Sequence, residues 1–504
     1  MKRLLLFLTA WLMCHSVFAA DLVEVYQQAL YSDPIYQQAI AQRLSTQEGV
    51  PINASALLPN VFAQINPTVT RSAFAGNNYD TNVAGVPLSP RNNTNLFYDL
   101  SLNVTQTVFD YAKFANLSTA LANSKGADAS LNAALQNLMV RTANAYFAIL
   151  RDEENLSYSE ASKLAYANQL DQIRQQYEVG LKTITDVYTA QASYDSAVAI
   201  SLAAENAVDK DKENLRVITG KYYNKLAALG EDFPLLHPQP DNIDTWTKTA
   251  QRQNWSIKAA QYAIDAARYV IRQQFAGHLP TVALQGVLDK QYSKDINGYN
   301  SINQPTGTGT VTDRAITVNV NLPLFASGGV IASTRQAEYN YQISQQQSEQ
   351  TIRETINSTR QSFLSILSGI SQIKADRETI KSTISSLEGL EASYQVGTET
   401  LVNVLSQQQK VFQAQVAYAT DRYAYVNNLL ILKQGAGTLS FGDLRAINAW
   451  LSEKEHPGLL SIKKYQGYHS IKSNTATPPL PSPPVKPNSI SLNSKPKSSK
   501  LITQ

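Results

Sequence analysis

Two segments of the chain carry apolar residues at alternating spacings of three and four, which is the pattern of a helical heptad seam. The pattern is clearest between Ile352 and Tyr394, and it recurs more weakly between Leu131 and Leu156. It predicts two long helices, over residues 110–179 and 327–396. At 1.5 Å per residue, a helix of about 70 residues extends for about 105 Å, which is longer than an ordinary globular domain.

Shorter helical segments flank each long one. We expect them over the following ranges: residues 34–57, 184–219, 255–275 and 401–432. Asp33 followed by Pro34 is typical of a helix start, because proline suits the first helical position. Two short helices of roughly 24 and 35 residues, stacked end to end, extend for about 90 Å and so nearly match one long partner. Residues 221–254 and 438–455 would fill the remaining gap as an equatorial belt.

Four segments alternate apolar and polar residues with a period of two, which predicts strands with one apolar and one polar face. They cover residues 60–72, 96–108, 281–292 and 313–323. A soluble sandwich is one interpretation. However, the neighbouring long helices leave no element to cover the apolar face, and strands of about ten residues suit a bilayer. Four strands cannot close a barrel, so we expect a barrel shared among chains, with eight strands in a dimer or twelve in a trimer.

The chain repeats itself. The stretches YEVGLKTITDV and YQVGTETLVNV begin at Tyr177 and Tyr394, and Gly220 and Gly437 follow at the same offset. Each half carries the same elements in the same order, which predicts an internal duplication of residues 21–220 and 243–437.

The two ends of the chain differ from its middle. Residues 1–20 have the basic start, apolar run and small residues of a secretory signal, and they hold the only cysteine, Cys14. We therefore expect export and no disulfide in the mature protein. Residues 456–504 are rich in Pro, Ser and Lys and are predicted to be disordered. The signal and tail account for the net charge of +3, so the folded part is slightly acidic, which argues against nucleic-acid binding.

No pattern in the sequence indicates chemistry. The five histidines lack metal-ligand spacing, and Gly307 and Gly309 lack the strand and helix context of a phosphate loop. We find no pairing of nucleophile and base. The sequence therefore predicts neither an enzyme nor a bound cofactor or metal.

Several motifs together resemble the TolC family of outer-membrane efflux ducts along nearly the whole mature chain. They are the two Tyr-x-Val-Gly turns, the Leu-Pro before each strand pair, the Ile-Thr-Gly at Ile218 and the opening VYQQAL at Val25. The resemblance implies a trimer with a twelve-stranded barrel and an α-helical periplasmic tunnel. It also implies docking to an inner-membrane transporter of RND, ABC or MFS type through a periplasmic adaptor, and export of drugs, detergents, bile salts or unfolded proteins.

The resemblance also implies a gate, because the family closes its periplasmic end by links between neighbouring helical pairs. The linking positions match Gln169, Thr185, Asp186, Glu391 and Tyr394. Where the family has an arginine, this chain has Glu399, and the two pore-constricting aspartates are replaced by Asn403 and Ser406. We hypothesise that Lys182, the counterpart of Glu399 in the first repeat, supplies the exchanged salt bridge.

Simpler interpretations of these residues stay open. Thr183 and Asp186 fit a helix-start pattern, so Asp186 could serve only as a cap. Gly180 and Gly397 could simply end helices in the left-handed conformation. Tyr394 lies in the heptad seam and could be core packing. The sequence thus predicts a passive outer-membrane duct, with a coiled-coil structural or adhesive surface protein without a lumen as the alternative.

Overall fold

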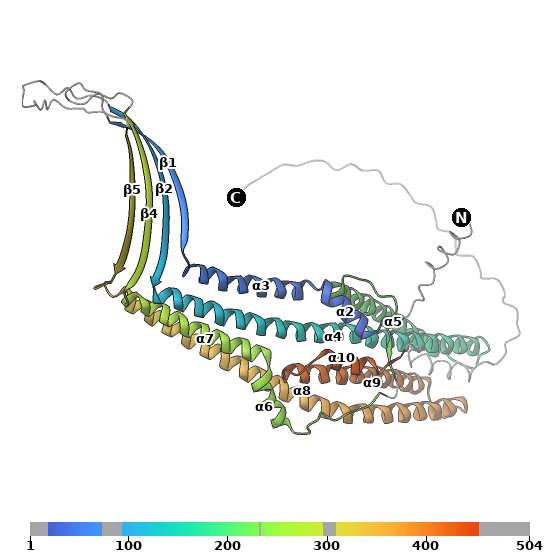
Figure 1. Cartoon of the computed structure of the whole chain (residues 1–504). Helices are drawn as coiled ribbons and strands as arrows, with labels where there is room; N and C mark the ends of the chain where they lie inside the picture. The colour runs from blue at the N-terminus through green and yellow to red at the C-terminus, as the bar shows by residue number, and fades with distance from the viewer. Residues whose placement is uncertain (1–18, 73–92, 231–232, 296–308, 453–504) are drawn as a thin grey trace, which may run out of the picture. The chain divides into compact units, whose positions relative to one another are not determined.

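The computed structural model describes residues 19–72, 93–230, 233–295 and 309–452. Residues 1–18 of the signal predicted over residues 1–20, and the tail predicted to be disordered over residues 456–504, lie outside the described residues. Most of the described chain is helical, and a smaller part forms strands (Figure 1).

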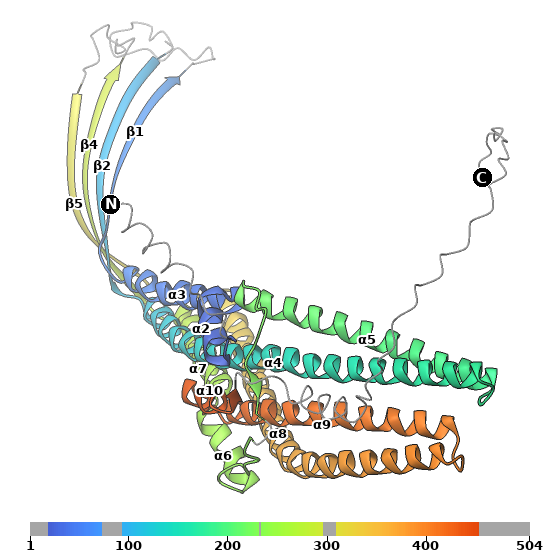
Figure 2. The same ribbon diagram turned by 90° about the vertical axis from the view of Figure 1, so that its right-hand side faces the viewer.

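Two helices dominate the described chain. They are α4 (Tyr111–Glu178, 68 residues) and α8 (Gly329–Gln395, 67 residues), each about 100 Å long at 1.5 Å per residue. The shorter helices are α2 (Leu22–Ser32), α3 (Pro34–Ser55), α5 (Ile184–Thr219), α6 (Ile243–Gln253), α7 (Trp255–Phe275), α9 (Leu401–Gly435) and α10 (Phe441–Asn448), with a 3₁₀ turn over Ala276–His278. Helices α3 and α5 pack along successive parts of α4, and α7 and α9 pack along α8 (Figures 1 and 2).

Local sequence sets where several helices start. The Asp33 carboxylate accepts from the Tyr36 N–H at 2.9 Å, and Pro34 occupies the first turn of α3. Asp110 caps α4 in the same way through the Lys113 N–H. A capping side chain satisfies a backbone donor that has no partner within the helix. These short polar residues therefore fix the junctions where strands or turns become helices.

One antiparallel sheet contains strands β1 (Asn60–Ser72), β2 (Asn93–Phe109), β4 (Thr281–Asp295) and β5 (Gly309–Asn321), in the order β1-β2-β4-β5. A second, two-stranded sheet pairs β3 (Ala228–Leu229) with β6 (Leu451–Ser452). One face of the large sheet is apolar and exposed. Its members include Val61, Ile65, Val69, Ile316, Val318 and Val320, each at least 59% exposed. In the described chain, the edge strands β1 and β5 each pair on one side only.

The main hydrophobic core joins both halves of the chain through α2, α4, α8, α9 and α10. Within it, Arg422 of α9 and Glu154 of α4 form a buried ion pair at 3.5 Å. The Tyr423 hydroxyl donates to Glu154 at 2.6 Å, and Arg422 donates to the carbonyls of Leu229 and Gly230 at 3.2 and 2.9 Å. A buried charge is tolerated only when it is paired and hydrogen-bonded. We call α4 with α5 the first helical pair and α8 with α9 the second. This network connects the segment after α5 to both pairs.

None of the helices that the structure describes has a stretch apolar and long enough to cross a membrane.

Candidate functional site

The predicted gate residues gather around two helix turns with the same backbone. After α4, Gly180 has φ of 79° and the Leu181 N–H donates to the Gln176 carbonyl at 2.8 Å. After α8, Gly397 has φ of 83° and the Thr398 N–H donates to the Ser393 carbonyl at 3.0 Å. This left-handed residue with a bond spanning six residues is the Schellman helix ending. Glycine suits both turns, because other residues rarely adopt positive φ.

In the first turn, Asp186 belongs to a capping box at the start of α5. The Thr183 N–H and hydroxyl donate to one Asp186 carboxylate oxygen at 3.0 and 2.8 Å, and the Asp186 N–H donates back to the Thr183 hydroxyl oxygen at 3.2 Å. The bond from the Thr183 N–H, then that from its hydroxyl, holds the pKa of Asp186 below its usual range, and nearby Lys182 lowers it slightly further. Within one chain, Asp186 therefore makes the contacts of a helix cap.

The second turn differs at the same positions. Thr400 caps α9 by accepting from the Asn403 N–H at 3.4 Å. The Asn403 side-chain amide then donates to the Glu399 carboxylate at 2.8 Å. Asn403 and Ser406 are exposed on the first turns of α9. Asn403, a position that we expect at the constriction, is thus bonded to Glu399 of the preceding turn.

One contact joins the two turns directly. The Lys182 ammonium lies over the Tyr394 ring, 4.1 Å from its centroid. A cation in this position is attracted by the negative face of the ring. Lys182 belongs to the turn between α4 and α5, and Tyr394 to the last turn of α8. A cation–π contact therefore links the two repeats where we predicted a salt bridge of Lys182, and a salt bridge to a neighbouring subunit stays a prediction.

A small hydrophobic cluster lies behind this contact. It contains Tyr166, Leu170, Ile173, Ala190, Ala197, Leu401 and Leu405, with Tyr394 packed against it. The cluster draws on α4, α5 and α9, so it holds the two helical pairs together. The Tyr166 hydroxyl also donates to the Leu405 carbonyl at 3.2 Å. Sequence reasoning missed Tyr166, because this residue lies beyond the weaker heptad seam of Leu131 to Leu156 and its partner Leu405 is 239 positions away.

The other predicted gate residues lie on three different helices. Gln169 and Glu391 are half-buried on α4 and α8, and Thr185 is exposed in the first turn of α5. The Thr185 carbonyl accepts from the Thr189 hydroxyl at 2.9 Å, which is a contact within one helix. The single chain therefore brings Lys182 and Tyr394 together, and Glu399 and Asn403 together, but it does not gather the full set into one cluster.

The contacts around the two turns are hydrogen bonds, a cation–π contact and apolar packing. Among the described residues, no group of three or more His, Cys, Asp or Glu side chains could hold a metal ion. What the geometry offers is a set of weak, reversible contacts between two helical pairs. Such contacts suit a change in packing.

Curated relatives match most of the chain. The chain is 34% identical to outer membrane protein TolC of Vibrio cholerae over 454 residues, which covers 90% of this chain and 99% of the relative. It is also 34% identical to outer membrane protein TolC of Escherichia coli, covering 86% of each. The alkaline protease secretion protein AprF of Pseudomonas aeruginosa is 26% identical over 458 residues, covering 88% of this chain and 90% of the relative.

Solved structures share the fold. The Campylobacter jejuni CmeC outer membrane channel has a TM-score of 0.69 at 16% identity and covers 88% of both chains. A CusC structure has a TM-score of 0.70 at 16% identity, covering 83% of this chain and 93% of that one. The family described as "Outer membrane efflux protein" matches residues 25–221 and again 246–438. The resemblance predicted from the sequence is confirmed, and the chain belongs to the outer membrane efflux protein family.

Proposed function

We propose that three copies of this chain form an exit duct whose twelve-stranded barrel lies in the outer membrane. The observation that carries the proposal is the sheet itself. Strands β1 and β5 each leave one edge unpaired in the described chain, and one face carries many exposed apolar side chains, among them Val61, Ile316 and Val320. In water, unpaired strand edges and an exposed apolar face both favour aggregation. Joining the β1 edge of one chain to the β5 edge of the next inside a bilayer pairs the edges and places the apolar face against lipid.

Disulfide crosslinking between the edge strands tests the barrel. The chain has no cysteine after Cys14, so cysteines introduced at Asn66 of β1 and at Ala315 or Thr317 of β5 would be the only pair in the mature protein. Two strands separate β1 from β5 within one chain, about 14 Å at 4.8 Å per strand, which a disulfide cannot span. Oxidation should therefore produce trimers that reduction dissolves. Monomers only, with every pairing tried, would contradict the shared barrel.

The helices would continue this barrel as a periplasmic tunnel, with the two turns as its gate. The support comes from the contacts between turns, since Lys182 and Tyr394 link the helical pairs and the cluster around Tyr166 packs them. Opening would rearrange the pairs around Gly180 or Gly397 between two packings. The exposed Asn403 and Ser406 side chains would line the narrowest part of the tunnel. Because they carry no charge, they would bind cations more weakly than aspartates at the same positions.

The partners and cargo follow from family membership. We propose a periplasmic adaptor and an inner-membrane transporter of RND, ABC or MFS type as partners, because the family resemblance implies them and the chain belongs to the outer membrane efflux protein family. The relatives' names include both efflux and protease secretion. We therefore propose drugs, detergents, bile salts and unfolded proteins as cargo. The sensitivity of a deletion strain to dyes, detergents and antibiotics would show whether small molecules are among them.

The proposed duct arises from a duplication of residues 21–220 and 243–437. Two matches of one family description, over residues 25–221 and 246–438, support it. We also propose that residues 1–19 are removed as an export signal. Ala20 is buried and its backbone bonds with Lys225 and Ala227, so cleavage after Ala19 preserves these contacts better than cleavage after Ala20.

A coiled-coil surface protein without a lumen is the alternative function. Recording from the purified protein in a planar bilayer separates the two, since a duct gives discrete conductance steps and a solid stalk gives none.

A further inference from the structure

Charged side chains on the large sheet are sorted by face. The register places Leu102, Leu288 and Arg314 side by side across β2, β4 and β5, and Leu100 beside Lys290 in the neighbouring row. Side chains two residues apart on a strand share a face. The apolar face therefore carries Arg71, Lys290, Lys294 and Arg314, whereas Asp99, Asp289 and Asp313 lie on the polar face. Among the described strand residues, no carboxylate side chain shares the apolar face with these cations.

The cations also gather at one end of that face. The half near the helices holds only uncharged residues such as Val61, Val282 and Val320, and the four cations lie toward the loops. Arg314 lies eight residues before Leu322, the residue that follows β5. This separation is about 27 Å of extended chain and about 20 Å along the membrane normal at a 40° tilt. The apolar band of such barrels is about 25 Å tall. Arg314 and Lys290 would thus lie where hydrocarbon gives way to headgroups.

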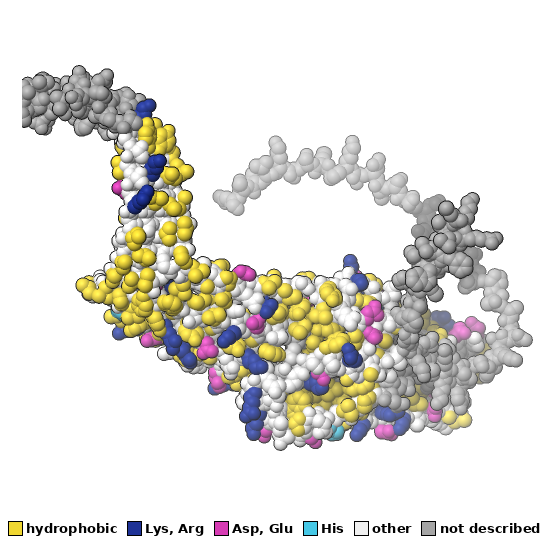
Figure 3. Space-filling model, viewed as in Figure 1, with side chains coloured by type: hydrophobic (Ala, Val, Ile, Leu, Met, Phe, Trp, Pro, Cys, Tyr) yellow, Lys and Arg dark blue, Asp and Glu magenta, His cyan; other side chains and the backbone are white. Residues whose placement is uncertain are grey.

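Lys290 and Arg314 are close enough to share one ligand. Leu288 pairs with Arg314, and Lys290 follows Leu288 by two residues, so the two cations are diagonal neighbours on adjacent strands, about 7–8 Å apart at Cα. Both side chains are exposed. An arginine fork can bond two oxygens of a phosphate, and a lysine adds a point charge. Figure 3 shows such basic side chains among hydrophobic ones over the sheet.

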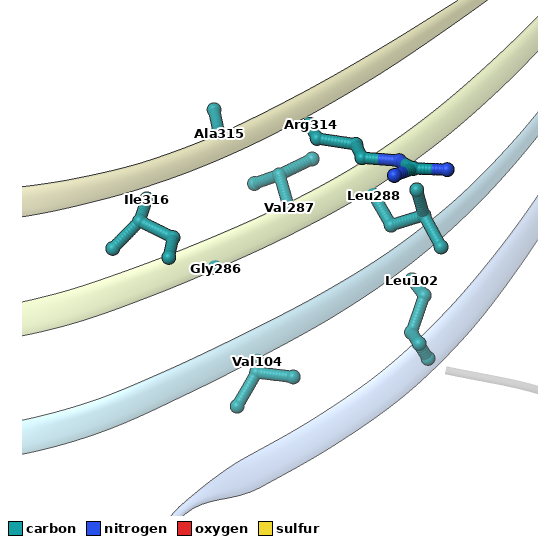
Figure 4. A pocket seen from close by; sticks show the side chains of 8 residues that line it. All are labelled: Leu102, Val104, Gly286, Val287, Leu288, Arg314, Ala315 and Ile316. Carbon is teal, nitrogen blue, oxygen red and sulfur yellow. The ribbon is translucent and has the colours of Figure 1, made fainter.

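Next to Arg314 the same face has a shallow apolar groove of about 610 Å³. Gly286 leaves the gap, and the side chains around it on this face are Leu102, Val104, Leu288, Arg314 and Ile316 (Figure 4). Val287 and Ala315, which the register puts on the other face, complete the lining. A Cβ added to Gly286 would approach only the Val104 Cβ, at 3.9 Å, so the space is open. An apolar groove with two cations at one end matches a molecule that has an acyl chain and an anionic head.

We propose that this part of the sheet binds an anionic, phosphate-bearing lipid in the leaflet farther from the helices, with Lys290 and Arg314 on the phosphate and the Gly286 groove on an acyl chain. Tyr98 and Tyr292, whose ring centroids are 6.2 Å apart, lie one row toward the loops from Lys290 and flank the headgroup level. The inference rests on the proposed function, since it requires the apolar face to meet lipid. Cations that merely extend to the water would attract any anionic headgroup, and lipid retention would then not depend on the Gly286 groove.

Lipid retention by the purified full-length protein tests this. The protein is reconstituted with equal amounts of phosphatidylglycerol and phosphatidylcholine, extracted gently, and its bound lipids are counted by native mass spectrometry. The unchanged protein should retain phosphatidylglycerol preferentially. The double variant Lys290→Gln/Arg314→Gln should lose at least about fivefold of that preference, since a basic residue near a charged membrane surface contributes about 1 kcal/mol.

Two further variants make the result specific. Arg353→Gln/Lys381→Gln removes the same charge from α8, away from the sheet, and should leave the preference unchanged. Gly286→Val fills the groove with a strand-forming residue, keeps every cation, and should lower the total lipid retained. It also serves as the test if the double variant does not assemble.

The outcomes separate this inference from the proposed function. Equal retention of both lipids by the unchanged protein, or an undiminished preference in the double variant, overturns the lipid site alone. Failure of the unchanged protein to float with vesicles of either lipid would instead overturn the membrane placement of the sheet.

Discussion

The two helix turns at residues 179–183 and 396–400 share one backbone but carry different side chains. Both end a long helix with a left-handed glycine, and both start the next helix with a threonine cap. The first then has Lys182 and Asp186 where the second has Glu399 and Asn403. The lysine lies against the other turn, whereas the glutamate bonds within its own.

This difference shows which parts of a repeated unit are free to change. The glycine and the cap are required by backbone geometry, so both copies keep them. The remaining surface positions are constrained only by what they face. The pairs can therefore diverge in charge without losing their turns.

The strongest test compares the glycines that end α5 and α9. Gly437 has φ of 73°, and an added Cβ would lie 2.5 Å from the Gln253 carbonyl oxygen. Gly220 has φ of 69° but its nearest neighbour would be 3.8 Å away. Gly437→Ala should lower the free energy of unfolding by about 2–5 kcal/mol, from backbone strain and overlap together, and Gly220→Ala by about 1–2 kcal/mol, from strain alone. Denaturant unfolding followed by circular dichroism measures both, and equal losses would contradict the difference in packing.

The caps of α5 and α9 should respond differently to truncation. Asp186→Ala removes a full capping box and should reduce stability by about 1 kcal/mol, whereas Asn403→Ala keeps the Thr400 cap and should cost about half as much or less. Because the folded-state pKa of Asp186 is lowered, its stabilisation is present above the ordinary aspartate pKa and is lost as pH falls through the folded value. Unfolding midpoints at pH 7 and pH 3 should therefore differ less in Asp186→Ala than in the unchanged protein. An identical pH dependence would contradict a stabilising role for the ionised carboxylate.

The contact between the turns should have a smaller effect on stability than on gating. Lys182→Gln removes a cation–π contact of about 0.5–1 kcal/mol. If that contact helps to hold the pairs together, the variant should open more often in planar-bilayer recordings. Lys381→Gln, which removes a lysine from α8 away from both turns, is the matched control. Charge reversal at Lys182 that leaves conductance unchanged would remove Lys182 from the gate.

The smallest expected effect on stability comes from two neighbouring carboxyl groups that only the second helical pair contains. In the second pair, Asp421 of α9 has its pKa raised to about 6 by burial and by the neighbouring Asp376 carboxyl of α8. The repeat offset, which is that between Tyr177 and Tyr394, makes Ala204 the counterpart of Asp421 and Ser159 the counterpart of Asp376. Both counterparts in the first pair are uncharged. A raised carboxyl pKa stabilises the fold fully below the ordinary aspartate value, and this contribution is lost as pH rises through about 6.

Asp421→Asn should therefore flatten the stability profile between pH 4 and pH 7 by a small amount, because Asp421 is partly exposed and screened. Ala204→Asn in the first pair provides a control with the same new side chain. A profile that keeps its slope in Asp421→Asn would contradict a raised pKa at Asp421.

The sequence by itself determined what depends on neighbours along the chain. Heptad spacing indicated the long helices, alternation indicated the strands and their two faces, and Asp33, Thr183 and Gly180 marked starts and ends. Each of these follows from backbone geometry over a few residues. The motifs that repeat at Tyr177 and Tyr394 also carried the family resemblance, which the comparisons confirm.

Only the tertiary structure decided which distant side chains meet. Lys182 over Tyr394, Tyr166 on the Leu405 carbonyl, and Arg422 beside Glu154 all join residues more than 200 positions apart. No local pattern encodes such pairs, because they depend on how the helical pairs pack and on the strand register that sets Lys290 beside Arg314. A period along the chain fixes the face a residue occupies, but packing between elements fixes what that face touches.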